Sequence, residues 1–173
     1  SFQGVSSKKA VVHCGGVCGA TGRKYEYHGT PTCAACNELY AGSGQCDYGC
    51  IGFGDCVKAC RYDAIHLVDG VARVDPKKCV GCTMCAMQCP KHLINMVDAD
   101  ATVNVICSSQ NSGKETRERC KNGCIACKRC EKTCPHDAIH VEGNLARIDY
   151  DKCTRCGECV KVCPVGCIHS FEL

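Results

Sequence analysis

Cysteine spacing is the feature of this sequence with the clearest chemical content. Residues 124–135 and residues 153–164 each read C-x2-C-x2-C-x3-C-P. Four thiolates that converge on one small volume are the ligands of a [4Fe–4S] cluster. Gaps of two residues let a tight loop wrap three thiolates around one face of the cluster, while the fourth cysteine points away from it. Two such runs in succession therefore predict a pair of iron–sulfur clusters.

The two runs resemble those of bacterial ferredoxins, in which the fourth cysteine of each run ligates the other cluster. The resemblance implies that crossed ligation ties the two runs together and keeps the clusters close enough for electron exchange. The implied sets are cluster 3, with Cys124, Cys127, Cys130 and Cys163, and cluster 4, with Cys153, Cys156, Cys159 and Cys134.

An internal repeat extends the pattern toward the N-terminus. Residues 50–90 align with residues 124–164 without a gap, and DAIH at 63–66 recurs at 137–140. The repeat predicts an α+β fold of tandem bacterial 2[4Fe–4S] ferredoxin-like modules, with short strands and helices around the clusters. The expected domains are 1–45, an N-terminal strand and a cysteine-containing insertion that belong to the first module; 46–98, the first ferredoxin module; and 99–173, the second ferredoxin module.

Alternating apolar residues and turn pairs locate the short strands. Asp69-Gly70 and Gly143-Asn144 tolerate the positive φ of a two-residue hairpin turn. We expect hairpins of 64–68 with 71–74 and of 138–141 with 145–148, opening strands at 10–13 and 103–106, and closing strands at 93–97 and 168–171.

The first module departs from the repeat at one ligand position, where Phe53 stands in place of Cys127. Cys46 lies one short turn upstream of Cys50 and is the natural replacement. The expected sets are cluster 1, with Cys46, Cys50, Cys56 and Cys89, and cluster 2, with Cys79, Cys82, Cys85 and Cys60. The alternative is that the cluster 1 site lacks a fourth ligand and holds a [3Fe–4S] cluster or nothing.

Other cysteines lie outside these four sets. The insertion between the first opening strand and residue 46 contains Cys14, Cys18, Cys33 and Cys36. Four thiols in one irregular segment fit a fifth [4Fe–4S] cluster, but they also fit a zinc ion or unligated core thiols. The remaining three, Cys107, Cys120 and Cys167, are expected to be buried as small apolar side chains.

The composition favours an inorganic core over an ordinary apolar one. Of 173 residues, 23 are cysteine, only 5% are aromatic and none is Trp. Zinc sites usually pair their cysteines or mix in histidine, and a disulfide-bonded protein would leave one of the 23 thiols unpaired. The formal net charge of +3 counts thiols as neutral. Four clusters of about −2 each would make the loaded chain acidic, which argues against a nucleic-acid partner.

No apolar run is long enough to span a membrane, and no signal peptide, Gly-rich dinucleotide loop, P-loop or hydrolytic triad is visible. The chain is therefore expected to move electrons without substrate chemistry of its own. A start at Ser1 without Met favours a processed or excised piece. Basic residues around Lys128 and Arg129 lie beside cluster 3, where they suit either an acidic redox partner or a solvated loop.

Several segments resemble the ferredoxin-like B subunit of the Rnf complex in its clostridial-type long form. They are VHCGG at 12–16, YEY at 25–27, CDYGCIGFGDC at 46–56 and VICSS at 105–109. Rnf complexes pass electrons from reduced ferredoxin to NAD+ and export Na+ or H+. The resemblance implies an electron-relay subunit at the cytoplasmic face of the cell membrane, with soluble ferredoxin as electron donor and the other subunits of a membrane complex as partners.

Members of this family also carry an N-terminal membrane helix and a further cluster-binding segment. This sequence shows neither, so a truncated domain is expected. Two other classes stay open at this point. One is a free soluble polyferredoxin or the iron–sulfur subunit of a hydrogenase or formate dehydrogenase. The other is a structural zinc-binding protein without electron transfer.

Overall fold

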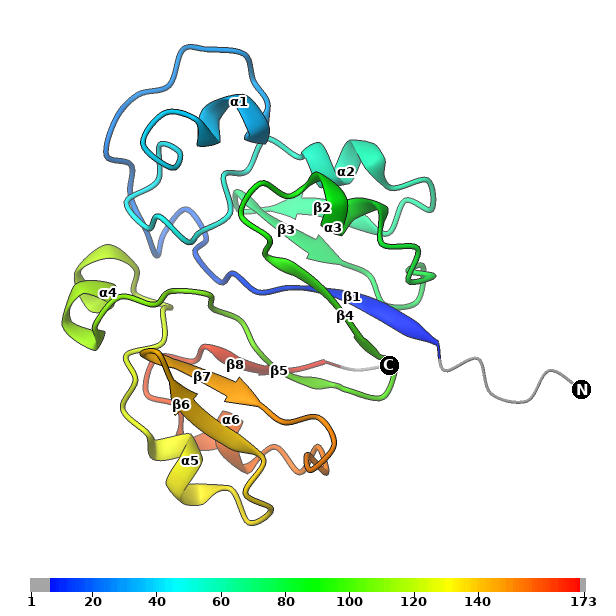
Figure 1. Ribbon diagram of the computed structural model, residues 1–173, viewed down its shortest axis with the longest axis vertical. Helices are drawn as coiled ribbons and strands as arrows, with labels where there is room; N and C mark the ends of the chain where they lie inside the picture. The colour runs from blue at the N-terminus through cyan, green and yellow to red at the C-terminus, as the bar shows by residue number, and fades with distance from the viewer. Residues whose placement is uncertain (1–6, 172–173) are drawn as a thin grey trace, which may run out of the picture.

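A computed structural model describes residues 7–171, and every element in it is short (Figure 1). The helices are α1 Cys33–Asn37, α2 Asp55–Ala59, α3 Met84–Gln88, α4 Gly113–Arg119, α5 Arg129–Thr133 and α6 Glu158–Val162. The strands are β1 Lys8–Val12, β2 Ile65–Val68, β3 Val71–Val74, β4 Ile94–Asp98, β5 Val103–Val105, β6 Ile139–Glu142, β7 Leu145–Ile148 and β8 Ile168–Ser170. No helix in the described part of the chain is long and apolar enough to cross a bilayer.

The strands form antiparallel pairs that repeat along the chain. In the first half β1 pairs with β4, from Lys8 opposite Asp98 to Val12 opposite Ile94, and β2 pairs with β3. In the second half β5 pairs with β8 and β6 pairs with β7. The expected hairpins, opening strands and closing strands are thus confirmed, with ends that move by one or two residues.

Both hairpin turns have the backbone that the sequence predicts. Asp69 and Gly70 have φ values of 49° and 82°, and Gly143 and Asn144 have φ values of 57° and 64°. Two consecutive positive φ angles match the right-handed twist of the flanking strands. Gly70 meets a second requirement, because a Cβ there would lie 2.8 Å from Cys18 Sγ.

The four short helices that follow the cysteine loops begin and end in the same way. Each begins after a left-handed residue, with φ between 61° and 79°, at Gly54, Thr83, Lys128 and Gly157. Each ends at an extended cysteine, at Cys60, Cys89, Cys134 and Cys163. A left-handed residue other than glycine costs about 1–2 kcal/mol, so Thr83 and Lys128 show that the loop geometry outweighs local preference.

Each half has its own small core of strand residues and cysteines. The first is built around residues such as Val12, Ile65 and Val71, and the second around residues such as Val103 and Ile139. Few apolar side chains enter either core, because short two-stranded pairs offer few inward positions. The cysteine loops fill much of the remaining interior.

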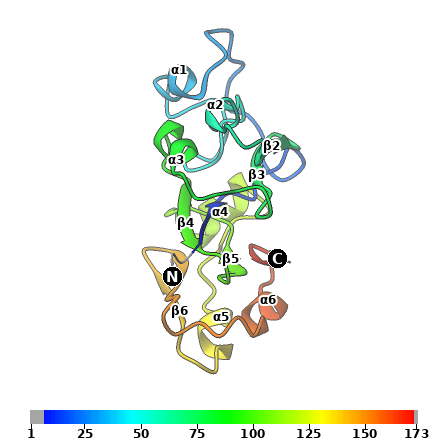
Figure 2. The ribbon, with the colours of Figure 1, turned by 90° about the vertical axis from the view of Figure 1, so that its right-hand side faces the viewer.

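The two halves lie end to end along the long axis of the molecule (Figures 1 and 2). Hydrogen bonds join them: His13 Nδ1 lies 2.7 Å from the carbonyl oxygen of Val105, and Ser108 Oγ donates to the carbonyl oxygen of His13 at 2.8 Å. Burial lowers the pKa of His13, so this imidazole is held neutral at neutral pH. The halves are therefore docked through specific polar contacts.

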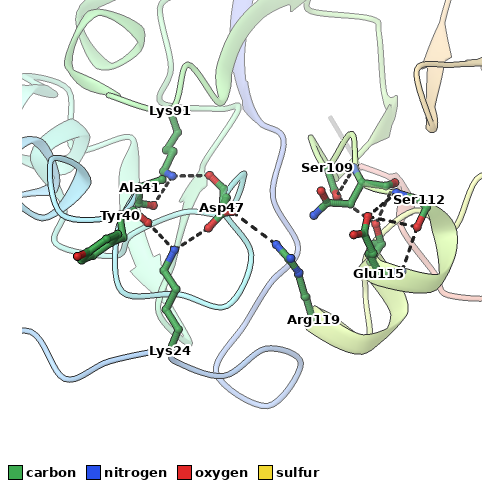
Figure 3. A network of polar contacts seen from close by, with 11 residues as sticks. Lys24, Tyr40, Ala41, Asp47, Lys91, Ser109, Ser112, Glu115 and Arg119 are labelled. Atoms are coloured by element: carbon green, nitrogen blue, oxygen red, sulfur yellow. Dashed lines mark hydrogen bonds and ion pairs between the residues drawn. The ribbon is translucent and has the colours of Figure 1, made fainter.

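Helix α4 lies beside this junction and was not expected from the sequence. Ser112 Oγ accepts a hydrogen bond from the backbone N–H of Glu115, and the Glu115 carboxylate accepts one from the N–H of Ser112 (Figure 3). This reciprocal capping box satisfies donors that the first turn leaves free. The S-x-x-E pattern at 112–115 was the available signal for the helix.

Candidate iron–sulfur centres

All 23 cysteines lie within residues 7–171, and none of them forms a disulfide there. Every thiol in this part of the chain is therefore chemically available as a ligand. Within the same residues, no three His, Cys, Asp or Glu side chains are close enough to hold one metal ion between them. A [4Fe–4S] cluster binds each thiolate through a different iron atom and so needs a wider set than a single ion does.

In the second half, the structure gathers both predicted sets. Burial raises the pKa of Cys130 to about 11. The neighbouring thiols of Cys124, Cys127 and Cys163 make a smaller contribution in the same direction. The pKa of Cys159 is raised for the same reasons, and its neighbours are Cys153, Cys134 and Cys156. The group around Cys130 combines three thiols from the run at α5 with Cys163 at the end of α6. The group around Cys159 combines three thiols from the run at α6 with Cys134 at the end of α5. This arrangement is compatible with the crossed ligation that the resemblance to bacterial ferredoxins implies.

The predicted cluster 2 set lines one cavity of the first half. The cavity lies between the loop that precedes α3 and the start of the β2–β3 hairpin, and its lining includes Cys60, Cys79, Cys82 and Cys85. Cys85 is buried, and burial raises the pKa of its thiol to about 11. Ligation would have to remove this proton, as a coordinated metal does.

At the cluster 1 position the structure brings together Cys50, Cys56 and Cys89, and the fourth thiol is Cys33. These four cysteines line one cavity. Burial raises the pKa of Cys56 to about 12, with Cys50, Cys33 and Cys89 as the neighbouring thiols that raise it further. Cys46, which the sequence indicated as the replacement ligand, does not line this cavity.

Asp55 explains how a residue from the insertion reaches this position. Its carboxylate accepts hydrogen bonds from the backbone N–H of Cys33 at 3.0 Å and of Ala34 at 3.2 Å. These bonds attach the first turn of α1 to the first turn of α2, which carries Cys56. Phe53 occupies the vacant ligand position and packs on Tyr27 of the insertion, with 5.6 Å between ring centroids.

The insertion cysteines do not come together as one set. Cys33 lines the cavity at the cluster 1 position, whereas Cys36 is fully buried with Ser43 Oγ at 3.9 Å from its sulfur. Cys18 is exposed beside the hairpin turn at Gly70. Cys14 lies at the junction of the two halves, where the backbone N–H of Cys50 donates to its sulfur at 3.3 Å.

Backbone N–H groups are aimed at the crossing cysteines in a repeated way. The N–H four residues later donates to the sulfur of Cys60 at 3.4 Å, of Cys89 at 3.5 Å and of Cys134 at 3.4 Å. Such bonds stabilise negative charge on sulfur and are one of the factors that set cluster potentials. The donor sets therefore fit [4Fe–4S] clusters in number, spacing and hydrogen bonding.

The middle cysteine of each regular run is exposed, at Cys82, Cys127 and Cys156. An exposed ligand provides a short route for electrons between a cluster and an external partner. At the equivalent position of the first run, Phe53 is covered by Tyr27. The cysteines gathered at the cluster 1 position thus include no exposed one, unlike the sets predicted for clusters 2, 3 and 4.

Taken together, the crossed cysteine sets and the short paired strands define a ferredoxin-type iron–sulfur protein. Two family models match: a 4Fe-4S dicluster domain at residues 123–167 and a 4Fe-4S binding domain at residues 71–94. The chain therefore contains two ferredoxin-type 4Fe-4S domains. These matches confirm the predicted iron–sulfur chemistry.

Three curated relatives make the assignment more specific. The B subunit of the Na+-translocating ferredoxin:NAD+ oxidoreductase complex of Acetobacterium woodii is 44% identical over 84% of this chain and 44% of its own length. The B subunit of an ion-translocating oxidoreductase complex of Methanosarcina acetivorans is 40% identical over 75% of this chain and 50% of its own length. The B subunit of the proton-translocating complex of Clostridium ljungdahlii is 40% identical over 86% of this chain and 53% of its own length.

The chain is a homologue of the Rnf-type B subunits, as the segments at 12–16, 25–27, 46–56 and 105–109 predicted. It spans about half the length of the curated relatives it matches.

Proposed function

We propose that this chain relays low-potential electrons through [4Fe–4S] clusters, as the ferredoxin-like part of a B subunit in an Rnf-type complex. The proposal is supported by two sets of four cysteines that each line one cavity, and by two further sets whose thiols neighbour the buried Cys130 and the half-buried Cys159. When bound, each cluster accepts and returns one electron. The protein supplies the thiolates, the N–H donors to sulfur and the apolar cover.

Three of the proposed ligand sets, those of clusters 2, 3 and 4, are the sets expected from the resemblance to bacterial ferredoxins and from the internal repeat. For cluster 1 we propose Cys33, Cys50, Cys56 and Cys89, because these line the same cavity. The tandem arrangement of two modules with crossed ligation follows from these sets. In this proposal Cys46 is not a ligand of cluster 1.

The proposed donor is a reduced soluble ferredoxin, and the proposed partners are the other subunits of a membrane complex that exports Na+ or H+. The names of the homologous B subunits support both. The proposed location is the cytoplasmic face of the membrane, where soluble ferredoxin is available. Lys128 and Arg129 are exposed next to the exposed Cys127, so an acidic donor would be attracted to cluster 3.

Anaerobically purified protein provides the first test of the function. We expect a broad visible absorption that bleaches when reduced ferredoxin is added, together with EPR signals of reduced [4Fe–4S] clusters. Arg129→Glu should slow the bleaching at low salt by up to about tenfold, whereas Lys77→Glu, on an exposed site of the other half, should not. A colourless protein that contains zinc would contradict the proposal and favour a structural zinc protein.

Association with a membrane complex is a separate question. The full-length subunit should co-purify with membrane subunits from detergent extracts. If it purifies alone and still exchanges electrons with ferredoxin, a free polyferredoxin is the correct description.

A further inference from the structure

Four cysteines outside the proposed sets line one cavity of about 40 Å³ between the two halves of the molecule, and they are Cys14, Cys46, Cys107 and Cys120. Cys14 and Cys120 are buried, and the other two are partly buried. The first half supplies two of these thiols and the second half supplies the other two. We call this group the junction set.

Cys46 and Cys120 are equivalent positions of the internal repeat. Each lies four residues before the first cysteine of a run, at Cys50 and at Cys124. Each also begins the same tight turn, because its carbonyl oxygen accepts a hydrogen bond from the backbone N–H three residues later, at 3.2 Å from Gly49 and at 3.3 Å from Gly123. The two cysteines are therefore delivered to the junction by the same local structure.

Cys14 and Cys107 are the second equivalent pair. Each follows an opening strand, and its sulfur accepts a hydrogen bond from the N–H of the first cysteine of the run, at 3.3 Å in both halves. The N–H two residues later also donates to each sulfur, from Gly16 at 3.4 Å and from Ser109 at 3.5 Å. These are donors of the kind that stabilise thiolates in iron–sulfur sites.

The four thiols lie near one another. Cys46 has the sulfur atoms of Cys14 and Cys120 as neighbours, and Cys107 has Cys46 as a neighbour. The same cavity contains an unsatisfied donor, since Asn111 lines it and Asn111 Nδ2 is buried with no hydrogen-bond partner among the described residues. A sulfide or thiolate sulfur in the cavity would be a suitable acceptor for this N–H group.

Polar contacts hold the two halves in register around the cavity. The residue after Cys46 is Asp47, the residue before Cys120 is Arg119, and the two form an ion pair at 3.5 Å (Figure 3). Asn122 Nδ2 also donates to the carbonyl oxygen of Gly15 at 2.8 Å, and Thr21 Oγ1 donates to the carbonyl oxygen of Arg119 at 2.7 Å. The junction set is thus built into a fixed interface.

We propose that the junction set holds a fifth [4Fe–4S] cluster, shared by the two modules. The proposal rests on the proposed function, because it assumes that the chain is loaded with iron–sulfur clusters. The N–H groups of Cys50 and Cys124 connect the junction set directly to a ligand of cluster 1 and a ligand of cluster 3. The site therefore lies between the two modules, where a relay along the chain has to cross.

Iron content and iron position test the proposal on anaerobically reconstituted protein. Five clusters require about 20 irons per chain, and Cys46→Ser combined with Cys120→Ser should lower this to about 16. Cys36→Ser removes a buried cysteine outside all the sets and should leave the iron content at about 20. Anomalous diffraction at the iron edge from wild-type crystals should show a compact iron cluster between the four junction sulfurs, a result that does not require any variant to fold.

The failure of this inference is distinguishable from the failure of the proposed function. Wild-type protein with about 16 irons, no anomalous density at the junction and full bleaching by reduced ferredoxin would overturn the fifth cluster alone. One zinc ion per chain that disappears in the double variant would overturn it in the same way. Wild-type protein without visible absorption would overturn the electron relay itself.

Discussion

Residues 46–60 and residues 120–134 are equivalent segments of the repeat, yet they complete their cluster sites in different ways. In the second half, the proposed middle ligand is Cys127, which belongs to the run itself and is exposed. In the first half, Phe53 takes that position and Cys33 of the insertion approaches from outside. In the proposed cluster 1 set, the insertion therefore supplies the missing ligand, and its Tyr27 packs on the residue at the vacant position, Phe53.

A second difference concerns the residue four positions after the crossing cysteine. This residue is Leu93 after Cys89 in the first half, and it is Cys167 after Cys163 in the second half. The Cys167 sulfur lies 3.6 Å from that of Cys163. Its hydrogen bonding lowers the pKa of Cys163 to about 5 and that of Cys124 to about 6. The second half thus has an additional sulfur beside Cys163 and Cys124 of the proposed cluster 3 set.

The largest expected effect is on cluster 1. Cys33→Ser should remove this cluster or leave it as a [3Fe–4S] cluster, with a loss of about one to four irons per chain. Cys33→Ser combined with Phe53→Cys should regain the lost iron, because it restores the ligand that the equivalent run uses. Iron analysis and EPR of the oxidised protein measure both outcomes.

Cys46→Ser is the matched comparison for that experiment. It should leave the cluster 1 signal in place, because Cys46 does not line the cluster 1 cavity. Loss of cluster 1 in Cys46→Ser and its retention in Cys33→Ser would restore the ligand set that the spacing alone suggested.

This contrast shows how far the sequence could predict the site. Three of the proposed sets follow from regular spacing, because two-residue gaps between ligands restrict the loop to one geometry. The position of Cys33 could not be predicted in this way. It depends on tertiary contacts, namely the two N–H bonds to Asp55 and the packing of Phe53 on Tyr27.

The fold shows the same limit. Alternation and turn pairs located the strands, because local pattern decides a hairpin. Helix α1 has only five residues, too few to form from propensity alone. Its position is set by Asp55, by the N-cap Thr32 and by burial of Cys33 and Cys36. The equivalence of Cys46 with Cys120 was visible in the repeat. That both cysteines line one cavity depends on how the two halves dock, which the sequence does not reveal.

The next prediction concerns Asp55. Asp55→Ala removes a carboxylate that accepts two backbone N–H bonds, and hydrogen bonds to a charged group contribute about 1.5–3 kcal/mol. The insertion should detach from α2, and cluster 1 should be lost several times faster on exposure to chelator. Stopped-flow absorbance with an iron chelator measures this rate. Asp151→Ala, at an exposed position of the other half, serves as the control, and an equal acceleration there would show a general effect of losing a carboxylate.

A smaller effect is expected at Cys167. Cys167→Leu gives the second half the residue type that the first half has at the equivalent position, Leu93. It also removes the S–H group beside Cys163 and Cys124. Loss of one hydrogen bond of about 1 kcal/mol lowers a one-electron potential by about 40 mV. Leu93→Cys should shift cluster 1 in the opposite direction. EPR-monitored redox titration checks both shifts, and a potential that does not move in either variant would exclude a tuning role for this position.

The smallest effect is expected at Asp47, which links the two halves. A hydrogen bond from Lys24 lowers its pKa, with further contributions from the nearby charges of Lys24, Arg119 and Lys91 (Figure 3). Because the pKa is lower in the folded state, the carboxylate stabilises the fold above its unfolded value of 3.8, and this stabilisation is lost as the pH falls through the folded pKa. Asp47 is 45% exposed, so solvent screening limits the contribution to about 1 kcal/mol or less.

Asp47→Asn should therefore lower the urea midpoint of the loaded protein slightly at pH 7, and the difference from wild type should shrink as the pH falls below about 4. Asp98→Asn is the matched control, because the 2.7 Å ion pair of Asp98 with Lys8 lies within the first half and does not cross the junction.

If the junction cluster exists, Asp47→Asn should also release about four irons at lower urea than the remaining irons, since Asp47 is adjacent to Cys46. Asp98→Asn should release all its iron in one transition, because its ion pair touches no part of the junction.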